Sequence, residues 1–419
     1  MATTGYKITP TLQTIFEHTN NRHCFRGPKN TWWMVAQDNT SSDWALWEWD
    51  GTFPTVGTAG GWTRADDAAG GFVYVDTRGS ARPHVIFESG AGSFGDGRLH
   101  VLNKQATEYY EQWDYDSADD DWTQAVSNED AGVSNAEEAG FVLDSNNVPW
   151  VIYYDATPDV ECRYRSGGSW ASDTQIASSI TGTVGTNVRI DAFNWVDDDG
   201  DNAIGVIYVD GLTWRFTSKK DSDTLGSASW STPVTIYTAS SNGDDHVSAQ
   251  AALFGSDTTS TIIVVLKDGD SPANLMTVRR DPDGTWDTAV EHSDGDHTQP
   301  KVVLDTTNET AYLFVPGFAT GTGVRMEYYT ADATTTLSWS TATTVIEDDG
   351  VNTFRAEIAV PSHTCDSNTN IMVAAERSGG SDRVWWNEVD IAALPGAGGP
   401  RGPLGHPLHG AFGGPIGAG

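Results

Sequence analysis

Ionisable side chains that could hold a ligand recur near the starts of several predicted strands. Arginine and lysine can bind an anionic group, and histidine can also transfer a proton near neutral pH. The set is Arg22, His23, Arg189, His246, His297, Lys301 and Arg355. His246 and His297 recur as Asp-Asp-His and Gly-Asp-His, which is equally typical of a turn cap repeated at equivalent positions. The set predicts a ligand-binding surface and identifies no reaction.

A second candidate site is an acidic turn that contains Asp197, Asp199 and Asp201 around Gly200. Clustered carboxylates on a glycine turn can hold a hard cation such as Ca²⁺ or Mg²⁺ through oxygen ligands. No glutamate stands where a calcium loop has its bidentate ligand, so a solvated acidic turn is the alternative. We expect no other cofactor.

The elements that must position these residues are short strands between turn clusters. Residues 140–144, 149–155, 161–165 and 171–176 predict an antiparallel meander of four strands. Val151–Tyr154 is apolar on both sides of the pleat, which is typical of a strand buried on both faces. A single sheet cannot bury both of its faces, so similar sheets must stack on either side.

Repeats of this meander are marked by a tryptophan that follows each third strand. The tryptophans recur at intervals of 48 to 60 residues: Trp62, Trp122, Trp170, Trp230, Trp286 and Trp339. Seven second strands align with them: Thr31–Gln37, His84–Glu88, Pro149–Tyr154, Ala203–Val209, Thr261–Leu266, Ala311–Val315 and Ile371–Glu376. The pattern predicts an all-β fold, a seven-bladed β-propeller.

The seventh repeat has no fourth strand of its own. Tyr6–Phe16 resembles Trp230–Tyr237, a fourth strand elsewhere in the chain. We therefore expect Lys7–Phe16 to pair with Val384–Ile391 and to close the ring, which protects the sheet edges. The predicted domains are a propeller over residues 1–393 and a Gly/Pro-rich tail over residues 394–419.

Composition excludes some partners. The net charge is −34, from 58 acidic and 24 basic residues, and nucleic-acid binding would need a basic surface. The excess of aspartate over lysine resembles proteins of extreme halophiles, in which salt screens the self-repulsion. An ordinary acidic extracellular protein is the alternative. The beginning of the chain predicts neither a secretory signal nor a membrane-inserted segment.

Several other residues that could take part in chemistry are better explained by structural roles. The three cysteines, Cys24, Cys162 and Cys365, have no zinc spacing; a Cys24–Cys365 bridge is conceivable, but buried thiols are favoured. Trp32 and Trp33 should pack against opposite neighbouring sheets. Trp44, nearer a turn, is the better candidate for a surface platform that stacks on sugar rings.

The turn Asp281-Pro-Asp-Gly-Thr-Trp286 resembles a degenerate Asp-box of sialidase-like propellers. That family includes glycosidases, polysaccharide lyases and non-catalytic glycan binders. The resemblance implies the ring architecture and gives Asp281, Asp283 and Trp286 a fold-holding role. A sialidase would also need a Tyr–Glu nucleophile pair, which the sequence does not assign.

The tail combines glycine and proline with apolar residues at four-residue spacing, namely Leu404, Leu408, Phe412 and Ile416. This pattern predicts an anchor whose side chains enter pockets on a partner. We therefore expect a non-enzymatic virion component of a tailed virus of a halophilic archaeon. It would oligomerise in the particle, contact other virion proteins through the tail and recognise a host-surface glycan or glycoprotein. A glycan-processing enzyme, either a sialidase-like hydrolase or a polysaccharide lyase, and a ligand-free scaffold are the alternatives.

Overall fold

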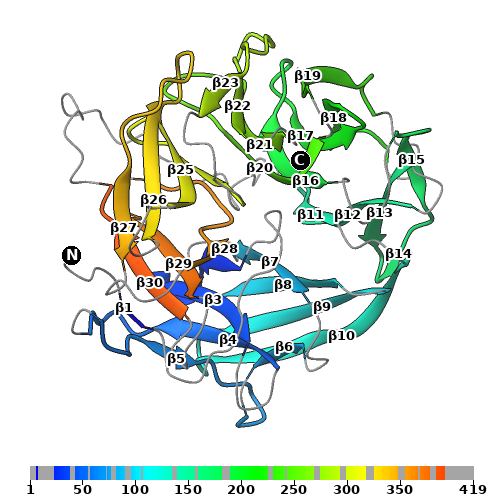
Figure 1. Cartoon of the computed structure of the whole chain (residues 1–419). Helices are drawn as coiled ribbons and strands as arrows, with labels where there is room; N and C mark the ends of the chain where they lie inside the picture. Colours follow the sequence, from blue (N-terminus) through cyan, green and yellow to red (C-terminus); the bar gives the residue numbers. More distant parts are fainter. Residues whose placement is uncertain are drawn as a thin grey trace.

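A computed structural model describes residues 6–7, 23–37, 43–54, 57–71, 73–76, 82–89, 96–104, 107–134, 139–155, 159–181, 189–224, 230–240, 243–268, 274–292, 299–317, 325–347, 354–366, 369–377 and 384–391. Within these ranges the strands form seven antiparallel sheets arranged as a ring around a central axis (Figure 1). The predicted seven-bladed β-propeller is confirmed. In the described part of the chain, no helix is long and apolar enough to cross a membrane.

The first three blades carry the longest and the most divided strands. Blade one contains β2 (Cys24–Arg26), β3 (Trp32–Gln37), β4 (Trp44–Trp49), β5 (Trp62–Arg64) and β6 (Tyr74–Asp76), with a 3₁₀ helix, η1 (Pro28–Asn30). Blade two contains β7 (Arg82–Ser89), β8 (Gly97–Lys104), β9 (Thr107–Asp116) and β10 (Asp121–Ser134). Blade three contains β11 (Ala139–Leu143), β12 (Pro149–Tyr154), β13 (Val160–Ser166), β14 (Ser169–Trp170) and β15 (Thr174–Ala177).

The remaining four blades are regular. Blade four contains β16 (Ile190–Val196), β17 (Asn202–Asp210), β18 (Thr213–Lys220) and β19 (Val234–Thr238). Blade five contains β20 (Gly243–Ala252), β21 (Thr261–Asp268), β22 (Leu275–Arg280) and β23 (Val290–His292). Blade six contains β24 (Lys301–Asp305), β25 (Thr310–Gly317), β26 (Arg325–Asp332) and β27 (Thr343–Glu347). Blade seven contains β28 (Phe354–Ala359), β29 (Ile371–Arg377) and β30 (Val384–Val389), and its outer strand is β1 (Tyr6–Lys7).

The N-terminal strand closes the ring as predicted. Tyr6 lies opposite Trp386 and Lys7 opposite Trp385, in antiparallel register. The rest of the predicted closing segment, residues 8–16, lies outside the described residues. The last blade therefore takes its outer strand from the other end of the chain, and this pairing links the chain's beginning to blade seven.

Blade two differs from the sequence-based prediction. His84–Glu88 was expected to be a second strand, but these residues belong to β7, the innermost strand of the blade. The second strand is β8, which contains Leu99–Asn103. The preceding β6 pairs with β4, so blade one extends to Asp76. Hydrophobic periodicity could not assign β6, because three residues carry too little pattern.

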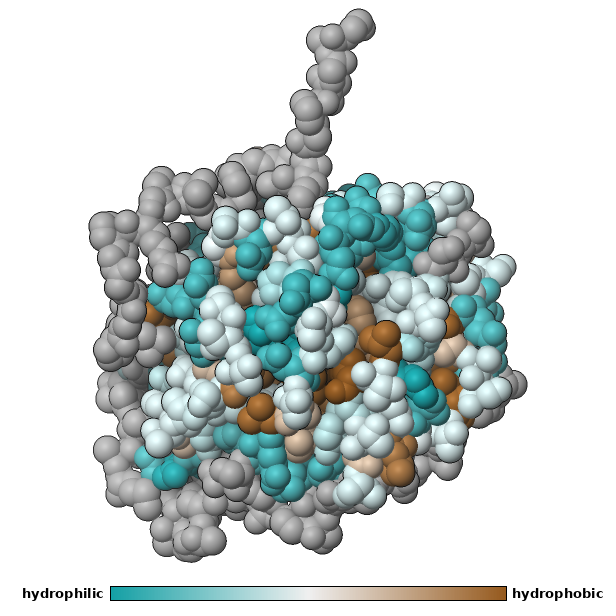
Figure 2. All heavy atoms as spheres, turned by 90° about the horizontal axis from the view of Figure 1, so that it is seen from above, coloured by the Kyte–Doolittle hydropathy of each residue, from teal (hydrophilic) through white to brown (hydrophobic). Residues whose placement is uncertain are grey.

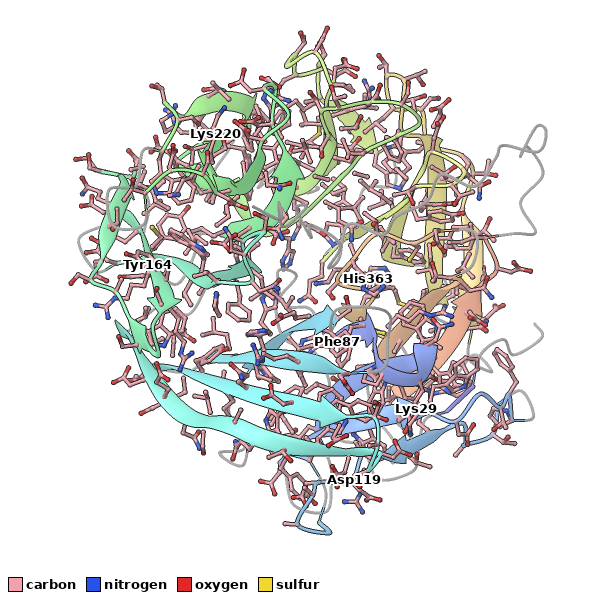
Figure 3. The ribbon with its side chains drawn as sticks, turned by 180° about the vertical axis from the view of Figure 1, so that it is seen from behind. Lys29, Phe87, Asp119, Tyr164, Lys220 and His363 are labelled. Atoms are coloured by element: carbon pink, nitrogen blue, oxygen red, sulfur yellow. The ribbon has the colours of Figure 1, made fainter. Side chains whose placement is uncertain are left out.

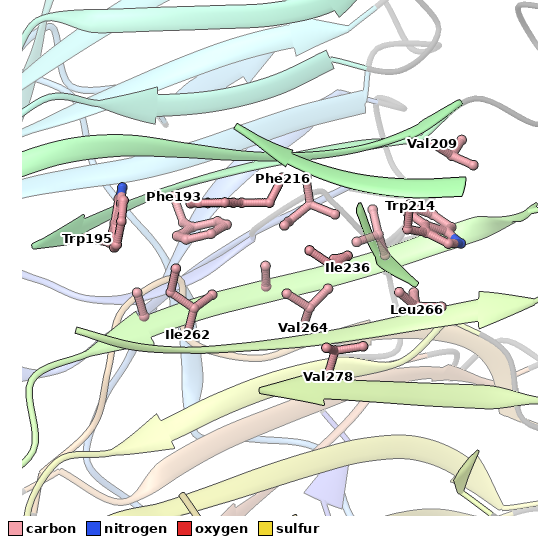
Figure 4. Packing of buried hydrophobic residues seen from close by; sticks show 14 of the residues in the cluster. Phe193, Trp195, Val209, Trp214, Phe216, Ile236, Ile262, Val264, Leu266 and Val278 are labelled. Atoms are coloured by element: carbon pink, nitrogen blue, oxygen red, sulfur yellow. The ribbon is translucent and has the colours of Figure 1, made fainter. Parts of the chain in front are cut away.

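Apolar packing between blades supplies the core. The buried apolar residues of the described chain form seven clusters, one between each pair of neighbouring blades. Between blades four and five, Phe193, Trp214 and Phe216 face Ile262 and Val264 (Figure 4). Trp32 packs toward blade seven and Trp33 toward blade two, as predicted from their alternation along β3. The ring buries both faces of each sheet, which explains the continuous apolar runs.

Candidate functional site

The antiparallel order gives the ring two distinct faces. One face carries the starts of the innermost strands β2, β7, β11, β16, β20, β24 and β28, and we call it the mouth face. The other carries the turns between first and second strands and between third and fourth strands, and we call it the hairpin face. Figure 3 shows the ring from behind, with Phe87 nearer the axis and Asp119 toward the outer edge of blade two.

Basic or histidine residues stand near the innermost strand starts of six of the seven blades. Blade three is the exception, because its inner strand starts at Ala139. The six residues are His23, Arg82, Arg189, His246, Lys301 and Arg355. Arginine at position 82 was not predicted, because β7 had been assigned as a second strand. The recurrence at one structural position brings these residues to the same face of the ring although they are far apart in sequence.

The predicted mouth residues whose side chains are described are all buried. His23, Arg189 and His246 are 1%, 6% and 5% exposed. His23 stacks on Trp44 with ring centroids 5.8 Å apart, so this imidazole is held against the core of blade one. Arg189 immediately precedes β16 and His246 lies in β20, and these two inner strands are neighbours. The structure therefore brings Arg189 and His246 to adjacent blades and places His23 on blade one.

Two of the predicted residues lie in irregular strand segments. The register of β20 shifts between Gly243 and Val247, a stretch that contains His246. The register of β28 shifts between Phe354 and Ile358, a stretch that contains Arg355. Bulges of this kind re-aim side chains and are common beside binding sites.

Several predicted site residues lie outside the described residues. They are the side chain of Arg355 and all of Arg22, His297, Leu404, Leu408, Phe412 and Ile416.

A cavity on the hairpin face of blade two was not anticipated. It has a volume of about 520 Å³ and is lined by Glu88, Asp96, Gly97, Arg98, Asp114, Tyr115, Asp116 and Thr123. The ends of β7 and β9 and the starts of β8 and β10 form its walls. Only the correct strand order brings these four segments together, so the misassigned blade two concealed the cavity from sequence analysis.

A buried polar network supports one wall of this cavity. His100 is 2% exposed; its Nε2 lies 2.9 Å from Glu88 Oε2, and its Nδ1 lies 2.7 Å from the Tyr110 hydroxyl. Burial lowers the pKa of His100, although Glu88 acts in the opposite direction. A neutral imidazole can donate a hydrogen bond from Nε2 to the carboxylate and accept a hydrogen bond from the Tyr110 hydroxyl at Nδ1. The network thereby fixes the position of Glu88, and burial favours the neutral form of the His100 imidazole.

A Tyr–Glu pair is present in blade three, but it is not arranged as a nucleophile. The Tyr153 hydroxyl donates to Glu161 Oε2 at 3.1 Å and also to Asp173. Burial, together with the hydrogen bond to Asp173, raises the pKa of Tyr153. A nucleophilic tyrosine needs the opposite shift or an adjacent free base. Arg163 also pairs with Asp173, so the group is a polar cluster that joins β12 and β13 to the connection between β14 and β15.

The predicted cation site contains a lysine ammonium. Lys220 Nζ lies 3.2 Å from Asp197 and 2.9 Å from Asp201, and it also pairs with Asp199. Asp197 Oδ1 accepts the backbone N–H groups of Asp199 and Asp201, which fixes the turn. The three carboxylate oxygens lie close enough together to ligate one ion. Metal binding stays a prediction, and Lys220 supplies a positive charge to the same carboxylates.

Trp44, the three cysteines and the Asp281–Trp286 turn were each given an expected role. Trp44 is 3% exposed, so the prediction that it forms a surface platform was wrong; it faces the core between blades one and two. All three cysteines are buried and free, as favoured. In the Asp281–Trp286 turn, Asp283 Oδ1 accepts the Thr285 N–H at 2.9 Å, and Trp286 packs on Phe216. These contacts fit the fold-holding role that was predicted for the turn.

Comparison with known proteins identifies the architecture. No protein-family model matches the chain, and no curated protein matches it. An ulvan lyase, polysaccharide lyase PL25, bound to -[GlcA(1-4)Rha3S]-, is similar over 93% of this chain and 96% of its own, with a TM-score of 0.53 and 10% identity. The BP39L lectin from Burkholderia pseudomallei is similar over 89% and 99%, with a TM-score of 0.53 and 14% identity. At these identities the likeness shows the propeller fold alone.

Proposed function

We propose that this propeller recognises glycans and that an anionic glycan binds at its mouth face. The observation that carries the proposal is the concentration of arginine, lysine and histidine at the inner strand starts of six blades, in a chain with a net charge of −34. Basic groups there would attract carboxylated or sulfated sugars, and their binding would be stronger at low salt.

The test compares an acidic polysaccharide, polygalacturonate, with uncharged dextran by isothermal titration calorimetry. We expect saturable binding of polygalacturonate, with at least about tenfold weaker affinity for a variant carrying Arg189→Gln and Lys301→Gln. Arg215→Gln is the matched control, because Arg215 pairs with Asp210 within blade four, away from the inner strands. Equal binding of dextran, or equal affinity of all variants, would contradict the proposal.

A more specific hypothesis is that this glycan-recognising propeller belongs to a virus particle of a halophilic archaeon. Its support is the acidic composition and the Gly/Pro tail with regularly spaced apolar residues, which would anchor the ring to other virion proteins. We propose that the ring displays its mouth face to a host glycan and that several copies assemble. A chain that ends before Leu394 should remain folded but fail to join the particle. Normal incorporation of that truncated chain would contradict the anchoring role.

A glycan-processing enzyme is the alternative, and the position of His246 on the blade next to that of Arg189 favours it. Histidine beside a charge-neutralising arginine is the arrangement that a polysaccharide lyase needs to remove a proton next to a carboxyl group. Incubation with polygalacturonate should then produce unsaturated sugars, which absorb ultraviolet light, and His246→Gln should abolish their release. Binding without product supports recognition instead.

A further inference from the structure

The blade-two cavity is separate from the proposed mouth site, because it opens on the hairpin face. Its lining comes from the turn ends of β7, β8, β9 and β10 and includes none of the inner strand starts. Its volume of about 520 Å³ lies within the range of small-ligand pockets. Whatever binds here would therefore bind independently of an anionic glycan at the mouth face.

The polar groups of the cavity are held in place before any ligand arrives. Glu88 is fixed by His100 on one oxygen and by Asn147 Nδ2, 2.8 Å from Oε1, on the other. Arg98 Nε donates to Asp114 Oδ1 at 2.8 Å, and its Nη1 lies 3.7 Å from Glu88. Because these side chains are already ordered, a ligand would lose little binding free energy to side-chain ordering.

Hydrogen-bonding capacity and charge together define the ligand class. Glu88 and Asp114 accept hydrogen bonds, Arg98 donates them, and neighbouring sugar hydroxyls do both. Four of the lining residues are carboxylates and one is a guanidinium, so an anionic sugar would be repelled. The Tyr115 hydroxyl is already committed to Asp120 at 2.6 Å, which leaves its ring as part of the wall. We propose that this cavity binds an uncharged pyranose through Arg98, Glu88 and Asp114.

The experiment uses the full chain with methyl glucoside, methyl galactoside and methyl mannoside as probes, observed by saturation-transfer NMR and calorimetry. Galacturonate and CaCl₂ are the counter-probes. Arg98→Met removes the donor, and Thr123→Trp fills the cavity without changing the Glu88 network. Arg215→Met is the control, because Arg215 forms a similar ion pair with Asp210 outside any part of this cavity. Thermal melting confirms that each variant is folded.

We expect at least one glycoside to bind saturably to the wild type and to the Arg215→Met variant. Both cavity variants should weaken that binding by at least about tenfold. The proposal is overturned if no glycoside binds, if Thr123→Trp leaves binding unchanged, or if galacturonate or Ca²⁺ binds here instead. Variants of Arg189 and Lys301 should leave this binding intact, so failure here is distinguishable from failure of the mouth-face proposal.

Discussion

His100 shows how one buried side chain can make stability depend on pH. Its imidazole lies between Glu88 and Tyr110, and the nearby Arg98 and Asp114 act in opposite directions on its pKa. Burial is the largest effect and lowers that pKa below the value of about 6.5 that an exposed histidine has. Between the two values, the unfolded chain binds a proton that the folded chain does not, so acidification favours unfolding.

We therefore expect His100 to contribute to a loss of stability below about pH 6.5. The comparison is between the wild type and His100→Gln, which retains a hydrogen-bonding side chain but cannot titrate. From pH 7.5 to pH 5, the melting temperature of the wild type should fall more steeply than that of the variant. Parallel melting curves across this range would show that the folded protein binds the proton as readily as the unfolded chain.

Lys220 gives a second prediction, which tests whether the lysine ammonium or a bound cation balances the charge of the acidic turn. Its ammonium balances Asp197, Asp199 and Asp201, and these hydrogen bonds raise its pKa. In Lys220→Met, three carboxylates would face one another without a counter-charge. We expect a lower melting temperature in dilute buffer, with recovery on adding millimolar Ca²⁺, whereas the wild type should respond less. Identical responses would exclude both the balancing role of Lys220 and cation binding in its place.

Individual roles were harder to predict than residue types. The alternation of Trp32 and Trp33 along one strand predicted their opposite directions, because it depends only on strand geometry. Trp44 was misjudged because its burial depends on blade two, which lies far along the chain. His100 carried no sequence signal, since its partners Glu88 and Tyr110 come from two other strands. Networks of this kind become visible only when strand order and register are known.

At the scale of elements, links between blades combine apolar packing with buried charge. Arg279 is 3% exposed and donates from Nε to the Ala333 carbonyl of blade six at 2.7 Å. It also donates to the Thr334 carbonyl and pairs with Asp281 and Asp287. Arg279→Met should reduce the free energy of unfolding by about 3–5 kcal/mol, because it leaves buried acceptors and carboxylates unpaired. Denaturant titration measures this loss.

The matched control for that variant is Arg215→Met. Arg215 is partly exposed and pairs with Asp210 of its own blade at 3.0 Å. Its removal should cost about 1 kcal/mol or less, as is typical of ion pairs near the surface. Equal losses in the two variants would mean that the contacts between blades five and six add nothing beyond an ordinary ion pair.

The pairing of β1 with β30 gives the second prediction at this scale. β1 covers the outer edge of β30. The ring of Trp386, a residue of β30, packs on the rings of Trp49 and Trp62. Deleting residues 1–16 should lower the melting temperature and reduce stability by roughly 2–4 kcal/mol, because it opens a sheet edge and loosens the seam between blades one and seven. Deleting residues 394–419 is the control and should leave melting unchanged. An unaltered melting temperature after the N-terminal deletion would contradict closure by β1.

Most elements could be predicted from sequence because they repeat. The meander of blade three, whose predicted fourth strand is divided into β14 and β15, and the incomplete last blade followed from alternation and turn residues, which act locally. Blade two could not be assigned in the same way, since β6 is short and the β7–β8 connection is long. The mouth residues follow from the repeat, whereas the cavity depends on blade two and was therefore missed.

At the scale of the whole molecule, the acidic excess reaches the surface. Asp96, Asp116 and Asp199 are exposed on the hairpin face, while the buried ionisable residues of the described chain include acids such as Asp191 and Glu376 as well as the bases Arg189 and Lys301. Figure 2, which views the ring edge-on, shows hydrophilic and intermediate surface with apolar residues in small groups. Because the chain has 58 acidic and only 24 basic residues, most of its carboxylates have no basic residue to neutralise them.

This distribution predicts that the folded ring is more stable in concentrated salt. At about 1 M ionic strength the screening length falls to about 3 Å, which suppresses repulsion between neighbouring surface carboxylates. Compaction brings these carboxylates together, so screening should favour the folded state over the unfolded chain. Melting temperatures measured from dilute buffer to molar NaCl and KCl should rise with salt, whereas uncharged sucrose at matched osmolality should not reproduce the same dependence. A melting temperature that stays flat or falls would mean that the acidic surface imposes no net repulsion on folding, and it would remove the main support for a halophilic source.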